Sequence, residues 1–93
     1  IVQKGNRELV ALAQNKRGDM EMKDGKFKEA LVDGYLRTIL LFREVETAQP
    51  EALYKAVKCF EELGQSSQAE RWRKQLLSEY AQSEYARKLR AGQ

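Results

Sequence analysis

The stretch Ala52–Gly64, which reads ALYKAVKCFEELG, decides the fold class of this chain. Its apolar residues recur at steps of three and four positions, a spacing that places them on one face of an α-helix. These residues are Leu53, Ala56, Val57, Phe60 and Leu63. Pro50 suits the first turn of such a helix, where its missing N–H leaves no bond unmade, and Gly64 suits the position just past the end. The stretch therefore predicts a helix that stops at a glycine turn.

A second helix is expected after this turn, and a short third helix near the end of the chain. Ser66 can cap the second helix, because a serine side chain can accept a hydrogen bond from a free N–H of the first turn. The apolar stripe of that helix is Ala69, Trp72, Leu76 and Tyr80. Ser83 can cap the last helix in the same way, and its apolar residues are Tyr85, Ala86 and Leu89. The second half thus reads as a helical pair followed by a short helix.

The first half has the same layout. Asn6 can cap a helix that runs to about Asp24, and Gly25 breaks it. A second helix is expected from about Lys26 to Arg43, with apolar residues most of the way round. Because such a helix is usually covered on two sides, we expect it in the middle of the stack.

The two halves align at an offset of 39 residues. The matched identities are Ala13 with Ala52, Lys16 with Lys55, Gly25 with Gly64, and Ala30 with Ala69. Each copy therefore has a helix, a glycine turn, and an alanine one turn into the next helix. A period of this length is typical of a helical repeat array.

Composition agrees with a small, folded, all-helical domain. The chain has 93 residues, 42% of them hydrophobic, and a single proline. The 17 basic and 14 acidic residues leave a net charge of +3, which is too small to imply nucleic-acid binding by itself. No apolar run is long enough to span a membrane. Because the chain begins with Ile1, we expect it to be a segment of a longer protein.

These features resemble the tetratricopeptide repeat family. The family's pattern consists of a small residue, a turn glycine, an aromatic residue and an alanine. In the first copy these are Gly18, Gly25, Phe27 and Ala30. Residues 52–80 resemble a second copy. The tail, residues 76–90, is similar to the ending of bacterial envelope repeat proteins, such as the Tol–Pal coordinator and outer-membrane assembly lipoproteins. The resemblance covers roughly residues 11–90, and it implies a location in the bacterial periplasm or cell envelope.

The resemblance implies an all-α fold of helix–turn–helix pairs stacked in an α-α superhelix. One domain, residues 1–93, would hold repeat one at about 7–44, repeat two at about 48–81 and a capping helix at about 83–91. In the first pair, Gly18 would face Ala30. The first helix departs from the family pattern, because Gln14, Arg17 and Glu21 stand at mostly apolar positions. That helix would pack poorly, be rotated, or be covered by another chain.

Catalysis is disfavoured by the residues that the sequence lacks. Without histidine, no Ser-His-Asp or Cys-His arrangement can form. Cys59 is the single cysteine and sits in an apolar stretch, so we interpret it as a core residue and expect no zinc site. We predict no catalytic residue, no metal and no cofactor.

Protein binding is the predicted function, and in this family the first helix of each pair lines the concave face. The implied lining is Asn15, Asp19, Met22, Lys23, Tyr54, Lys55, Lys58 and Glu62. Tyr54 is the best anchor, because it is large, stiff and amphipathic. Asp19 and Asn15 stand where the family's chaperone-tail clamp has Asn and Lys, so that particular ligand is rejected. The partner would be another protein or a peptide.

Two alternatives accompany this prediction. The basic residues Arg71, Lys74, Arg87, Lys88 and Arg90 could bind an anionic surface, either nucleic acid or lipid headgroups, although a solubilising face that offsets the C-terminal helix dipoles explains them better. The second alternative is self-association into a homodimer, because fewer than three repeats rarely bury enough surface to be stable alone.

Overall fold

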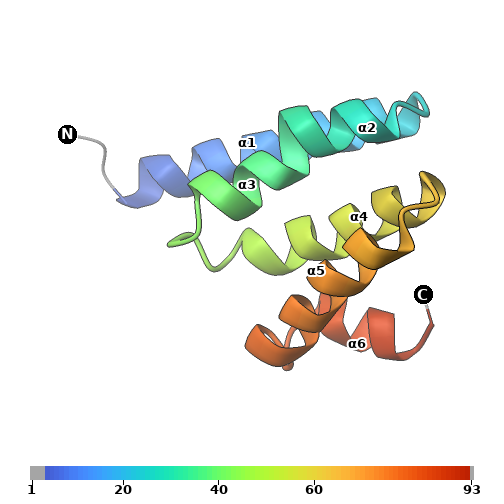
Figure 1. Ribbon diagram of the computed structural model, residues 1–93. Coiled ribbons are helices and arrows are strands. Elements are labelled where there is room, and N and C mark those ends of the chain that lie inside the picture. Colours follow the sequence, from blue (N-terminus) through green and yellow to red (C-terminus); the bar gives the residue numbers. More distant parts are fainter. Residues whose placement is uncertain (1–3, 93) are drawn as a thin grey trace.

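The computed structural model describes residues 4–92, and every regular element in that range is helical (Figure 1). The elements are α1 (Lys4–Lys23), α2 (Phe27–Ala30), η1 (Leu31–Tyr35), α3 (Leu36–Leu41), α4 (Gln49–Glu62), α5 (Ser66–Glu79) and α6 (Glu84–Arg90). Because α2, η1 and α3 follow one another without a break, they form one helix over residues 27–41, here called the middle helix. The all-α prediction is confirmed, and the ends of the predicted domain, residues 1–3 and 93, lie outside the described range.

The helices pack in chain order. Figure 1 shows α1 beside the middle helix, α4 next to them, and α5 and α6 on the far side of α4. The middle helix contacts both α1 and α4, as its apolar composition predicts. However, Val32, Leu40 and Leu41 remain 53%, 60% and 61% exposed, so a third side of this helix is uncovered. The main core lies between the middle helix, α4, α5 and α6.

Both predicted glycine turns are present and have the same geometry. Gly25 has a φ of 78° and Gly64 a φ of 74°, in the left-handed region that favours glycine. In each turn, the residue after the glycine donates a backbone hydrogen bond to the carbonyl five positions earlier. Lys26 N donates to Glu21 O at 2.8 Å, and Gln65 N donates to Phe60 O at 2.9 Å. This bond pattern is the Schellman motif, which pairs carbonyls that the helix end leaves free.

The closest approach between α1 and the middle helix occurs at two glycines. A Cβ built on Gly34 would lie 2.6 Å from the Cα of Gly18, and one built on Gly18 would lie 2.8 Å from the ring of Tyr35. Gly18 was expected to face Ala30, one turn earlier. The contact occurs one turn later, at Gly34, because Gly34 has no side chain and lets the two backbones approach closely. It falls within η1, a turn of π-helix, which places one extra residue in the helix.

Pro50 and Ser83 have their predicted roles at helix starts, whereas Asn6 and Ser66 do not cap their helices. Pro50 lies in the first turn of α4, and the Ser83 hydroxyl accepts a hydrogen bond from Ala86 N at 3.1 Å. Asn6 lies inside α1, which already begins at Lys4, so it does not cap that helix. Ser66 is the first residue of α5, and the residue before it makes no capping bond through its side chain.

A buried glutamine ends the middle helix, which the sequence analysis did not foresee. Gln49 is 1% exposed, and its Nε2 donates to the carbonyls of Thr38 and Phe42, both at 2.8 Å. These bonds satisfy two acceptors at the end of α3. The connection over residues 42–48 also places Val45 against Ala11, in a small second core. It is therefore packed rather than a free linker.

Candidate functional site

A pair of tyrosines forms the centre of the candidate site. Tyr54 on α4 and Tyr85 on α6 have ring centroids 5.4 Å apart, with the planes tilted by 45°. Lys58 Nζ lies 5.4 Å from the Tyr54 centroid, and Lys88 Nζ lies 5.2 Å from that of Tyr85 and 6.0 Å from that of Tyr54. We call these four residues the tyrosine–lysine surface. All four are partly exposed, so both aromatic area and positive charge are accessible there.

A network of polar side chains joins α1 to α4 beside this surface. Lys55 Nζ donates to Asp19 Oδ1 at 2.8 Å and to Glu51 Oε2 at 2.7 Å. Tyr35 donates its hydroxyl to Asp19 Oδ1 at 2.5 Å, and Asn15 Nδ2 donates to Glu51 Oε1 at 3.1 Å. We call these five residues the Asp19–Lys55 network. Since its members come from α1, the middle helix and α4, it holds the two helical pairs in one register.

The electrostatics follow from partial burial. Burial alone would lower the pKa of Lys55, but its hydrogen bonds to Asp19 and Glu51 and their charges outweigh that effect and raise it. Burial, together with the hydrogen bond to Asp19, raises the pKa of Tyr35 well above its usual range. Burial and the charge of Glu51 raise the pKa of Tyr85. The effect on Tyr85 shows that the network and the tyrosine–lysine surface are electrostatic neighbours.

The structure places the predicted lining residues at different depths. Asn15 is only 1% exposed and donates to the Ala48 carbonyl at 3.2 Å, so it lies beneath the surface. Met22 packs against the core, with its sulfur 3.7 Å from the Tyr35 hydroxyl. Lys23 and Glu62 are exposed at the ends of α1 and α4. Asp19, Tyr54, Lys55 and Lys58 are partly exposed, and they form the part of the predicted set that is accessible at the site.

Four members of the site were not among the predicted lining residues: Tyr85, Lys88, Glu51 and Tyr35. Tyr85 was assigned to the apolar stripe of the last helix, and only its contact with Tyr54 shows its place in the site. Glu51 follows Pro50 and carries no motif of its own. The signal that could have found it is the i,i+4 spacing to Lys55, which puts opposite charges side by side on a helix.

The structure divides the predicted basic patch among four places. Arg87 and Arg90 donate to the carbonyls of Gln82 and Ala81, both at 2.9 Å, and so tie α6 to the segment before it. Arg71 lies over the Trp72 ring, 5.0 Å from the centroid. Lys88 belongs to the tyrosine–lysine surface, and Lys74 lies exposed on α5.

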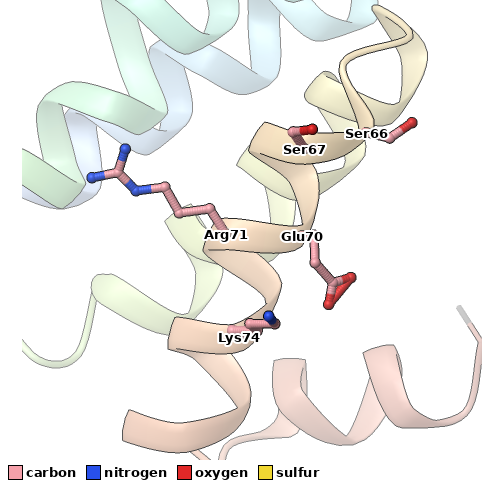
Figure 2. A pocket seen from close by; sticks show the side chains of 5 residues that line it. All are labelled: Ser66, Ser67, Glu70, Arg71 and Lys74. Carbon is pink, nitrogen blue, oxygen red and sulfur yellow. The ribbon is translucent and has the colours of Figure 1, made fainter.

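A shallow depression lies along α5. Its lining residues are Ser66, Ser67, Glu70, Arg71 and Lys74. Figure 2 shows Arg71 and Glu70 extending to opposite sides of the helix, and all five residues come from α5 alone. Because no second element closes it, this depression lacks the converging groups of a ligand site.

Cys59 is fully buried, and burial raises the pKa of its thiol to about 12, which keeps it protonated. Over residues 4–92 no cluster of three or more acidic or cysteine side chains could hold a metal ion. None of the helices in that range is both long and apolar enough to cross a membrane.

Comparison with known proteins adds no relative. No protein-family model matches the chain, and neither a curated protein nor a solved structure matches it.

Proposed function

We propose that this chain is a tetratricopeptide-like repeat module with two helical pairs and a capping helix. Two features support this proposal. The glycine turns at Gly25 and Gly64 have matching φ angles and hydrogen bonds, and they are 39 residues apart. Ala30 and Ala69, at the same offset, are both buried. In a stacked array of this kind, successive first helices share one face.

We further propose that the module is non-catalytic and binds a peptide or a partner domain on the face formed by α1, α4 and α6. The observation that carries this proposal is the half-exposed Tyr54–Tyr85 pair with a lysine on either side. Tyrosines offer a large contact area at a low cost in side-chain entropy, and they are frequent hot spots of protein interfaces. The Asp19–Lys55 network fixes the helices behind them.

Site-specific photo-crosslinking tests the proposal. A photoreactive phenylalanine analogue replaces Tyr54 in one variant and Lys74, exposed on α5, in a control. Both are expressed in the source organism and matched for helicity by circular dichroism. We expect a discrete protein product from position 54 that is absent from position 74 and weakened by Lys58→Glu. Identical products from both positions, or none from position 54, would refute the proposed site.

The competing proposal is anionic-surface binding by the basic C-terminal helices. It has weaker support, because Arg87 and Arg90 are tied to backbone carbonyls and Lys88 lies with the tyrosines. Counterion release would make such binding fall steeply with added salt. Retention of single-stranded DNA or anionic vesicles that disappears as salt rises would favour this competitor.

A further inference from the structure

The tyrosine–lysine surface carries positive charge that the carboxylates of residues 4–92 neutralise only in part. Within the described residues no carboxylate comes within 4.0 Å of Lys88. Lys58 has one partner, Glu61, at 3.9 Å, but Glu61 is also bound by Arg73 at 2.7 Å. The ammonium groups of Lys58 and Lys88 both lie against tyrosine rings. Each can therefore still form an ion pair with an anionic group of a partner.

Negative charge is in excess at the other end of the same face. Asp19 and Glu51 share the single ammonium group of Lys55, so two carboxylates are balanced by one cation. The side chains of Asp19 and Glu51 remain 33% and 22% exposed. A second cation could therefore approach them from outside without displacing Lys55.

The separation of these two charges is set by α4. Glu51 and Lys58 are seven residues apart, which corresponds to about 10 Å along a helix. A peptide in the polyproline II conformation covers about 9 Å in three residues, and because that helix has three residues per turn, side chains three positions apart point to the same side. The rings of Tyr54 and Tyr85 lie next to Lys58 and Lys88, where they can contact the residues between the two charges.

We propose that this face binds a peptide segment in the polyproline II conformation that carries an acidic side chain three residues away from a basic one. The acidic side chain pairs with Lys58 and Lys88, and the basic one pairs with Asp19 and Glu51. The intervening residues lie on the tyrosine rings. This inference rests on the proposed peptide-binding function and adds the chemistry of the ligand.

A random peptide library displayed on phage tests the inference, because it presumes no partner. The folded chain is the bait, beside a Lys58→Glu/Lys88→Glu variant and a Lys16→Glu/Lys74→Glu control. The control makes the same change in charge at exposed positions of α1 and α5. All three baits are matched for helicity before selection.

We expect the parent and the control to enrich peptides with Asp or Glu three positions from Lys or Arg, in one or both orders. The lysine variant should lose the preference for the acidic residue and bind an enriched peptide at least tenfold more weakly. Enriched peptides without this charge spacing, or an unchanged preference in the lysine variant, would overturn the inference and leave peptide binding intact. If no peptide is enriched on the parent, both the inference and the proposed function fail.

Discussion

Gly34→Ala is the most direct test of how the first helical pair packs. A methyl group at this position would lie 2.6 Å from the Cα of Gly18, 2.7 Å from its N and 2.9 Å from the Gln14 carbonyl oxygen. Carbon atoms in contact are normally about 3.5–4.0 Å apart. All three contacts are with backbone atoms, so no side-chain rotation can relieve them. The two helices must instead separate by roughly 1 Å, which loosens the contacts along their interface.

Two opposing effects set the change in the free energy of unfolding that Gly34→Ala should cause. Alanine is favoured over glycine inside a helix by about 0.5–1 kcal/mol. Overpacking in a close contact costs about 1–3 kcal/mol and occasionally more. An overlap with backbone atoms belongs at the upper end of that range. After the helix-propensity gain is subtracted, we expect the free energy of unfolding to fall by about 2 kcal/mol. In a domain of this size that loss lowers Tm by roughly 8–16 °C.

Urea unfolding followed by circular dichroism at the helical minimum measures the change. Val32→Ala is the matched control, because Val32 lies in the same π-helical turn and is 53% exposed; we expect it to shift stability by at most about 0.5 kcal/mol. Should Gly34→Ala fail to fold at 25 °C, loss of helicity relative to the control at low temperature gives the same answer. A neutral or stabilising Gly34→Ala would show that the glycine contact is absent.

Two further predictions concern a helix cap and alkaline pH. Ser83→Ala should lower the free energy of unfolding, measured by thermal unfolding, by about 1 kcal/mol, because the Ser83 hydroxyl accepts a hydrogen bond from Ala86 N. Ser66→Ala should lower it by almost nothing, because Ser66 does not cap α5. Equal losses in the two variants would contradict the cap assignment. The raised pKa values of Tyr35 and Lys55 mean that the folded chain holds protons which the unfolded chain releases above about pH 10. The free energy of unfolding should therefore be insensitive to these groups at neutral pH and fall above pH 10. The fall should be shallower in the Tyr35→Phe variant. A free energy of unfolding that rises above pH 10 would contradict the predicted direction.

Helix positions were predictable from the sequence because their signals are local. The apolar spacing of residues 52–64 and the glycines at 25 and 64 depend on neighbours within one turn, and the structure has helices and left-handed glycines where they were expected. The caps were less predictable. Asn6 and Ser66 have suitable side chains, but a polar residue near a helix start can cap it only if the chain leaves the helix at that residue.

The candidate site was only partly predictable, because it is assembled from different helices. Lys55 and Lys58 were named as surface groups, but their roles differ: Lys55 is held by two carboxylates, whereas Lys58 faces a tyrosine. Asn15 was expected on the surface and is buried, since α1 turns that side chain toward α4. Tyr85 was expected in the apolar stripe; it does pack against the core, but it also pairs with Tyr54, which the stripe did not predict.

By itself the sequence determined an all-helical chain, the ends of the helices at their glycine turns, and most of the apolar face of α4. These properties follow from backbone conformation and periodicity, which act within a few residues. Only the tertiary structure decided that Gly34 meets Gly18, that Gln49 closes the middle helix, and that Tyr54 and Tyr85 share two lysines. Such contacts depend on where helices cross and how each is rotated. A single turn of π-helix is enough to change that rotation, and no pattern within one helix encodes it.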